Sequence, residues 1–208
     1  MKAYRTIDKQ AEAVLIERKS RFIGRCFPVE SEAEATFQLN AIKKQFHDAT
    51  HNCHAFIVGE NGMISRCSDD GEPSGTAGVP ILEVLKAKQL TNVLCVVTRY
   101  FGGILLGAGG LVRAYSKSAS LAIEASGIVE ISPGLLMITT TDYSRYGQLE
   151  GPIRKLSTIE SIDFTDVVTI TSSLPAENAD DFIKQIIEAS DGRVMPKIGS
   201  EITLRRLI

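Results

Sequence analysis

The sequence has little net charge, no long apolar run and no closely paired cysteines, and each absence excludes a class of protein. The formal net charge is −2 for 208 residues, so any nucleic-acid binding must come from a local basic patch. No stretch reaches the roughly 18 consecutive apolar residues of a membrane-spanning helix. Residues 1–6 lack the apolar segment of a signal peptide. We therefore expect a cytoplasmic protein with no membrane segment.

The cysteines also limit the chemistry. Cys26, Cys53, Cys67 and Cys95 form no C-x-x-C pair, and each lies in or beside an apolar run. This pattern is typical of buried free thiols in a reducing compartment.

Histidines gather near Cys53 without completing a metal site. His47 and His51 can share one helix face. His51, Cys53 and His54, however, span a change from loop to strand, and no second cluster supplies the remaining ligands. We expect no metal and no cofactor. His51 is either a contact to nucleic acid or a neighbouring loop, or a structural histidine.

The first part of the chain alternates strands and helices. Ser31 and Glu34 have the spacing of a capping box, and the apolar positions that follow indicate a helix with one buried face. The apolar run at 93–98 predicts a central strand, and Gly127 predicts a helix C-cap. The expected elements are strands at 13–17 and 21–27 joined by a polar turn at 18–20, a helix from 31, strands at 53–58 and 62–67 joined by a turn at 60–62, a helix at 77–88, a strand at 93–98 and a helix at 111–126.

The pattern restarts after Ser132-Pro133-Gly134. We therefore expect an N-terminal domain at 1–131 and a C-terminal domain at 135–208. In the second part, Gly151-Pro152 should kink or split the first helix. The expected order is strand 135–141, helix 143–156, strands 159–164 and 167–172, helix 179–189 and an extended segment at 193–204, which is the βαββαβ order of a ferredoxin-like domain in an α+β protein.

Two glycine-rich stretches are the most specific motifs. They are SDDGEPSGTAGVPIL at 68–82 and RYFGGILLGAGGLVRAY at 99–115, and both lead into expected helices. Glycine permits positive φ and close approach of another group, and helix N-termini attract anions. The motifs therefore point to a partner that carries phosphate. Neither matches the phosphate-binding loops of nucleotide-binding proteins.

These motifs closely resemble the YigZ/IMPACT family (UPF0029), and the resemblance extends over essentially the whole chain. It implies an N-terminal domain similar to the second domain of a small-subunit ribosomal protein and to domain IV of elongation factor G. It implies a C-terminal domain similar to domain V of that factor. Eukaryotic relatives regulate translation initiation, and the family has no established catalytic residues. His54 and Gly151-Pro152 depart from the family pattern.

Basic groups converge on the second motif. Arg113 and Lys117, four residues apart, share a helix face near the helix N-terminus, and Arg99 and Tyr100 enter the same loop. Such a set suits a phosphodiester backbone, with the ring free to stack. The alternative is a solvated helix face in which glycines serve turns and packing. The candidate phosphate or nucleic-acid site comprises Arg99, Tyr100, Gly102, Gly103, Gly107, Gly109, Gly110, Arg113, Lys117, His51 and Arg66.

Asp69, Asp70 and Glu72 form an acidic group on the first motif. They suit either a cation or acid–base chemistry, or a turn whose carboxylates cap backbone N–H groups. They could also fix Arg66 or Arg99 and so order the basic site.

Three functions remain open. The first is a non-enzymatic, translation-associated regulator that binds RNA or the ribosome through the glycine-framed basic site. The second is a binder of, or an enzyme acting on, a phosphorylated small molecule or nucleotide, which is supported only by fold analogy. The third is a regulator with a protein partner. No Gly-x-Ser-x-Gly motif is present, which argues against a hydrolase.

Overall fold

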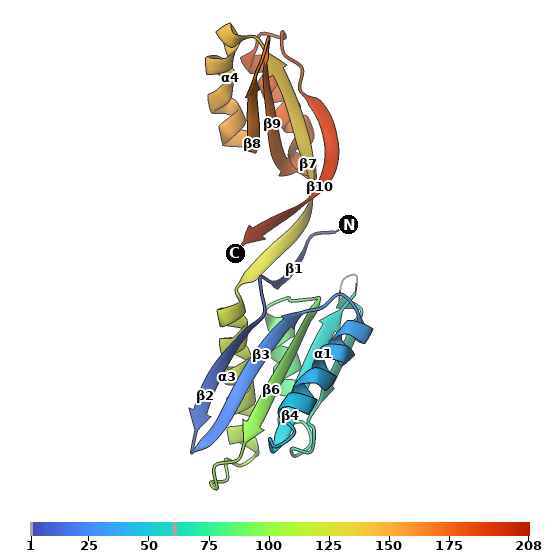
Figure 1. Ribbon diagram of the computed structural model, residues 1–208, viewed down its shortest axis with the longest axis vertical. Coiled ribbons are helices and arrows are strands. Elements are labelled where there is room, and N and C mark those ends of the chain that lie inside the picture. Colours follow the sequence, from blue (N-terminus) through green and yellow to red (C-terminus); the bar gives the residue numbers. More distant parts are fainter. Residues whose placement is uncertain (1, 60–61) are drawn as a thin grey trace. The chain divides into compact units, whose positions relative to one another are not determined.

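The computed structural model describes residues 2–59 and 62–208, and the chain divides into two compact units of mixed α and β structure (Figure 1). The N-terminal unit is Tyr4–Glu130 together with Arg206–Ile208, and the C-terminal unit is formed mainly by Ile131–Arg205. The expected α+β class is confirmed. Among the described residues, no helix combines the length and apolar character needed to cross a bilayer.

The N-terminal unit is an antiparallel sheet with helices on both faces, as Figure 1 shows. One core lies between the sheet and the helices α2 and α3, and a smaller one lies under α1. The strand order is β2-β3-β6-β4-β5. The elements are β2 (Ala11–Glu17), β3 (Ser20–Pro28), α1 (Glu32–Gln45), β4 (His51–Val58), β5 (Ile64–Ser68), α2 (Gly78–Ala87), β6 (Val93–Tyr100) and α3 (Ala108–Ser126).

Local sequence sets where α1 begins. The Ser31 hydroxyl accepts a hydrogen bond from the Glu34 backbone N–H at 3.2 Å, and the Glu34 carboxylate accepts one from the Glu30 N–H at 2.8 Å. The predicted capping box is therefore confirmed, with the reciprocal bond made one residue earlier than Ser31.

The turn between β2 and β3 is formed by Arg18 and Lys19, both with positive φ, +44° and +64°. This two-residue turn matches the twist of the paired strands, and Ser20 already belongs to β3. Of the turn expected at 60–62, Glu60 and Asn61 lie outside the described residues.

Helix α3 begins at Ala108, earlier than the sequence predicted. Gly107, at φ +72°, precedes it, and its carbonyl accepts the first helical bond from the Leu111 N–H at 2.9 Å. Further along, α3 packs so closely on β3 that a Cβ added to Gly24 would lie 2.6 Å from the backbone oxygen of Ser118. Gly127 ends the helix, as expected.

The C-terminal unit has the predicted βαββαβ order. Strands β10, β7, β9 and β8 follow one another across its sheet, which is the ferredoxin-like arrangement. The short β1 (Tyr4–Ile7) belongs to the N-terminal unit. The core lies under the two α-helices. The elements are β7 (Ile128–Thr141), α4 (Tyr143–Leu156), β8 (Thr158–Phe164), β9 (Val168–Pro175), the 3-10 helix η2 (Ala176–Asn178), α5 (Ala179–Ala189) and β10 (Lys197–Leu207).

The two units divide between Glu130 and Ile131, beside the boundary expected at Ser132-Pro133-Gly134, and β7 runs without a break through these residues. Its pairing with β9 starts only at Gly134, so the missing N–H of Pro133 breaks no bond to β9. A kink or a split was expected at the second proline of this part, and the split is absent. Gly151-Pro152 does not split α4. The buried Leu149 and Ile153 hold the helix on both sides of Pro152.

Candidate functional site

The acidic loop between β5 and α2 places its first carboxylate, that of Asp69, at the N-terminus of α2. Asp69 accepts hydrogen bonds from the backbone N–H groups of Gly75 (2.8 Å), Ala77 (3.0 Å) and Gly78 (2.8 Å). Burial acts to raise the pKa of Asp69, but the three donors outweigh it and hold the pKa below its ordinary value of 3.8. Asp69 thus caps α2, and this agrees with the turn-capping alternative.

The second carboxylate ties the same loop to neighbouring elements. Asp70 accepts hydrogen bonds from Lys43 Nζ at 2.6 Å and from the Asn52 N–H at 2.7 Å. Burial opposes ionisation, yet these two contacts lower the pKa of Asp70. The loop is therefore fastened to α1 through Lys43 and to β4 through Asn52.

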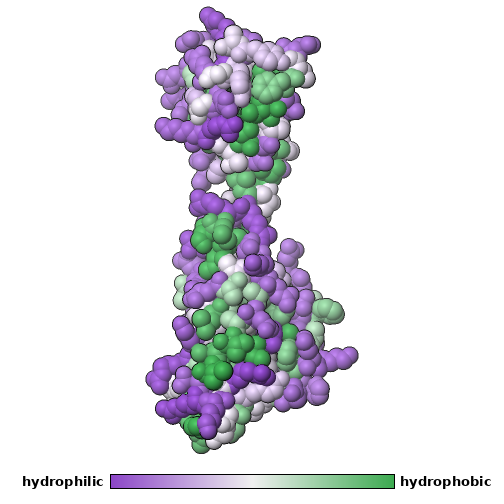
Figure 2. Space-filling model, turned by 60° about the vertical axis from the view of Figure 1, so that its left-hand side comes forward, coloured by the Kyte–Doolittle hydropathy of each residue, from purple (hydrophilic) through white to green (hydrophobic). Residues whose placement is uncertain are grey.

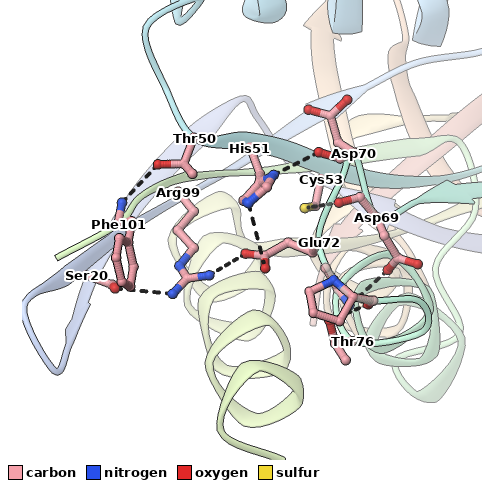
Figure 3. Close-up of polar contacts among 12 residues, drawn as sticks. Ser20, Thr50, His51, Cys53, Asp69, Asp70, Glu72, Thr76, Arg99 and Phe101 are labelled. Carbon is pink, nitrogen blue, oxygen red and sulfur yellow. Dashed lines mark hydrogen bonds and ion pairs between the residues drawn. The ribbon is translucent and has the colours of Figure 1, made fainter. Parts of the chain in front are cut away.

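The third carboxylate is the centre of a buried charge network (Figure 3). Glu72 Oε1 accepts a hydrogen bond of 2.6 Å from the Arg99 guanidinium and one of 2.8 Å from the Tyr115 hydroxyl. His51 lies beside it, with Nε2 3.8 Å from Glu72 Oε2 and Nδ1 2.9 Å from the Asp70 carbonyl oxygen. A buried ion pair persists only when further bonds satisfy both partners, and this network supplies them.

A thiol and a phenol close the network on its inner side. Cys53 Sγ lies 2.9 Å from the Asp69 carbonyl oxygen and 3.3 Å from the Tyr115 hydroxyl. Burial raises the pKa of Cys53 to about 12, with smaller contributions from the nearby carboxylates. Burial, followed by the Cys53 thiol and the Glu72 carboxylate, also raises the pKa of Tyr115. Both groups stay protonated at neutral pH, so neither is an activated nucleophile.

Arg99 also connects this network to the glycine-rich loop before α3. Its second terminal nitrogen donates to the Ser20 hydroxyl at 3.4 Å, and that hydroxyl also accepts a bond from the Gly102 N–H at 3.2 Å. A Cβ on Gly102 would lie 2.0 Å from the carbonyl carbon of Lys19. Only glycine fits here, and the loop lies directly against the β2–β3 turn.

Beside this contact, a pocket of about 230 Å³ opens between β2 and α3. We call it the cationic pocket. Figure 2, which brings the side of β2 and α3 forward, shows hydrophobic side chains exposed among hydrophilic ones on the N-terminal unit. Arg113 and Lys117 are exposed, and among residues 2–59 and 62–208 neither makes an ion pair. The pocket is lined by Leu15, Glu17, Arg18, Leu106, Gly110, Arg113, Ala114 and Lys117.

The structure separates the predicted basic residues into groups. Arg113 and Lys117 line the cationic pocket with Gly110, whereas Arg99 and His51 belong to the buried network. The charge of Arg99 is bound to Glu72 and is not offered to a phosphate. The expectation that a carboxylate fixes a nearby arginine therefore applies to Arg99.

The other predicted residues have separate positions. Arg66 lies on β5, the edge of the sheet opposite β2, and pairs with Glu32 of α1 at 3.5 Å. Tyr100 donates a hydrogen bond to Asp48 at 3.0 Å, and the Arg21 guanidinium lies 4.6 Å from the centre of its ring. Gly103, Gly107 and Gly109 lie in open parts of the loop and the first turn of α3, where an added Cβ would meet nothing within 4 Å.

Sequence reasoning missed Arg18, Ser20 and Tyr115, although a signal for the first two was present. The strands at 13–17 and 21–27 were expected to form a hairpin, and its turn contains Arg18. Register then places this turn beside the end of β6, because Arg21 pairs with Tyr100. Tyr115 ends the second motif but carries no local sign of its buried partner.

The groups of the buried network are engaged with one another. Glu72 is occupied by two donors, the Cys53 thiol is protonated, and no group of three or more histidine, cysteine or acidic residues in the described part of the chain is placed to hold a metal ion. The accessible chemistry is the positive charge of the cationic pocket and the apolar loop beside it.

Comparisons with known proteins agree with the motifs. Residues 18–123 match the model of the Impact N-terminal domain, and residues 139–193 match a domain of unknown function, DUF1949. The IMPACT family member YvyE of Bacillus subtilis is 40% identical over 99% of this chain and 95% of its own length. The IMPACT family member YigZ of Escherichia coli is 30% identical over 84% of this chain and 87% of its own.

A further relative and a solved structure extend the likeness. A Protein IMPACT homolog of Dictyostelium discoideum is 42% identical, over 44% of this chain and 27% of its own length. A crystal structure described as a hypothetical protein has a TM-score of 0.61 at 28% identity and covers 96% of this chain and 98% of its own. The likeness therefore extends over both units of the chain.

Proposed function

The chain belongs to the IMPACT family, and we propose that it acts in translation, without catalysis, by binding RNA or the ribosome through the cationic pocket. The observation that carries the proposal is the grouping of Arg18, Arg113 and Lys117 around one pocket at the start of α3. Gly107 has no side chain to cap that helix, so the N–H groups of its first turn add to the attraction for phosphate.

The size of the pocket favours a polymer over a small ligand. At about 230 Å³ it is smaller than the ~300–1,000 Å³ pockets that enclose small molecules. This volume holds a phosphate group, and the negative charge of Glu17 in the lining opposes the binding of a second anion. A phosphodiester backbone crossing the surface uses the charges without needing an enclosed cavity.

Co-sedimentation with ribosomes at about 50 and 200 mM salt tests the proposal. About three phosphate contacts, at a slope of about −0.7 per contact, predict roughly a 20-fold loss of affinity over that range. The Arg113→Glu/Lys117→Glu variant should not bind at either salt concentration. Both side chains are exposed, so the variant should still fold.

The control variant is Lys44→Glu/Lys184→Glu, which changes the net charge by the same amount at exposed positions on α1 and α5. It should bind like the unmodified protein. Equal loss in both variants would show a response to overall charge alone. Undiminished binding of the Arg113→Glu/Lys117→Glu variant would overturn the proposed site.

A further inference from the structure

Aromatic rings and one guanidinium group form a ladder that leads from the core of the N-terminal unit to its surface. The Tyr115 and Phe22 rings meet edge to face, with centres 5.2 Å apart. The Arg99 guanidinium follows, 5.3 Å from the centre of the Phe22 ring and 5.5 Å from that of Phe101. The cation therefore contacts two rings, within the range of cation–π attraction.

The inner members of the ladder are fixed. Phe22 and Tyr115 are fully buried, and Glu72 and Ser20 hold the Arg99 guanidinium (Figure 3). Phe101 is also restrained, because its backbone N–H donates to the Thr50 hydroxyl at 3.0 Å. The backbone that carries the outer ring is thus held in place before any ligand arrives.

The outer end of the ladder is open. Phe101 is 46% exposed, and Gly102 and Gly103 follow it without side chains that could cover the ring. Ile104 and the still more exposed Leu105 continue the same loop. Arg18 lies beside them, with its guanidinium 3.5 Å from the Leu105 carbonyl oxygen. The loop thus joins an exposed ring to the cationic pocket.

We propose that Phe101 is a stacking platform for an unpaired nucleobase, so that the RNA bound by this protein is single-stranded at this site. This inference rests on the proposed function. The base would stack on the exposed face of Phe101, while Arg18, Arg113 and Lys117 bind the phosphates of the adjoining RNA backbone. Stacking on an aromatic ring needs a base free of its neighbours, which loops and single strands provide.

Duplex RNA does not fit the same surface. Proteins recognise A-form helices through backbone and 2′-hydroxyl contacts across the shallow groove. Phe101, Ile104 and Leu105 offer none of the polar groups that such contacts need. The alternative partner, an aromatic side chain of a protein, lacks the phosphates that the neighbouring cations attract.

The test uses an oligoribonucleotide of about 12 residues with 2-aminopurine at one position, either single-stranded or annealed to its complement. Binding is followed by anisotropy, and stacking by quenching of the 2-aminopurine fluorescence. Phe101→Leu keeps the apolar bulk without the ring. It should weaken single-strand binding about tenfold and abolish the quenching. Phe101→Trp should retain both, and duplex affinity should not change in either variant.

The control is Phe37→Leu, the same change at a ring that is 71% exposed on α1. It should leave binding and quenching unchanged. If Arg113→Glu/Lys117→Glu loses all RNA binding while Phe101→Leu loses none, RNA binding by the cationic pocket is supported and the stacking proposal fails. Equal affinity for single strand and duplex also overturns it. If no RNA binds even at low salt, the proposed function itself fails.

Discussion

Arg99 and Glu72 form a 2.6 Å ion pair whose two side chains are only 6% and 3% exposed. Neither charge has access to enough water to replace its partner. The pair therefore acts as a fixed joint between the acidic loop and the end of β6. Removing one partner leaves the other charged and buried, and that cost is larger than the net benefit of the intact pair.

Glu72→Gln should test this joint directly. We expect the free energy of unfolding to fall by about 3 kcal/mol, because the buried Arg99 charge loses the negative charge of Glu72 and keeps only a neutral acceptor oxygen there. Urea unfolding measures the change. The control is Glu83→Gln, which removes the exposed Lys86–Glu83 pair, and it should cost no more than about 0.5 kcal/mol. Similar losses in both variants would show that the buried pair has no special role.

Asp69→Asn should give a stability loss that depends on pH. The pKa of Asp69 in the folded protein is below 3.8, so its ionised form stabilises the fold above that pH, and the effect is lost as pH falls through the folded-state pKa. The variant should be less stable by roughly 1–2 kcal/mol at pH 7, as for a lost helix cap. Urea unfolding at about pH 7, 5 and 3 measures the difference in free energy of unfolding between the unmodified protein and the variant. This difference should be the same at about pH 7 and 5 and smaller at about pH 3. A difference that narrows already between pH 7 and 5 would contradict the assignment.

Gly102→Ala and Gly109→Ala should have opposite effects on stability. The Gly102 Cβ would collide with the Lys19 backbone, whereas the Gly109 Cβ would meet open space in a helix. We expect a loss of at least ~2 kcal/mol at Gly102 and a gain of about 0.5–1 kcal/mol at Gly109. Thermal unfolding of the two variants compares them. A tolerated alanine at 102 would mean that the loop does not lie against the β2–β3 turn.

The cysteines should differ in reactivity. Cys67 is exposed, whereas Cys26, Cys53 and Cys95 are buried, and the pKa of Cys53 is raised to about 12. Iodoacetamide at about pH 8.5 should label Cys67 alone in the folded protein and all four residues in urea. Peptide mass mapping gives the result. Rapid labelling of Cys53 without denaturant would show that its network opens.

Arg99→Lys should separate the effect of the positive charge of Arg99 from the effect of its flat guanidinium group. Lysine can keep an ion pair with Glu72, but it lacks the flat guanidinium that contacts both Phe22 and Phe101. We expect a folded protein whose single-strand RNA affinity and 2-aminopurine quenching both decrease, with duplex affinity unchanged. The same fluorescence titration measures this. Full quenching in the variant would show that Phe101 needs no support from Arg99.

Many helices and strands of the fold could be predicted from sequence patterns that extend over only a few residues. Ser31 and Glu34 fix the start of α1 through neighbours within a few residues, and the apolar run at 93–98 becomes the fully buried part of β6. The exceptions are local rules that tertiary packing overrides. Pro152 remains inside α4 because the side chains around it are buried in the core.

The candidate site was less predictable because its partners are distant in sequence. The sequence left open whether the acidic group binds Arg66 or Arg99, and the structure shows that Glu72, 27 residues before Arg99, neutralises that arginine. Likewise, Arg18 reaches the loop before α3 only through a contact across 87 residues. The pairing of Arg113 with Lys117 needed helical spacing alone, and the structure places both in one pocket.

The contact between Gly24 and the Ser118 backbone has a consequence for how tightly the site can hold a ligand. Because no side chain separates β3 from α3 there, the helix cannot slide or roll on the sheet without a clash. The backbone positions of Arg113 and Lys117 are therefore fixed before a ligand binds. The ordering cost of association is limited to the ends of two side chains, which leaves more of the electrostatic attraction available as affinity.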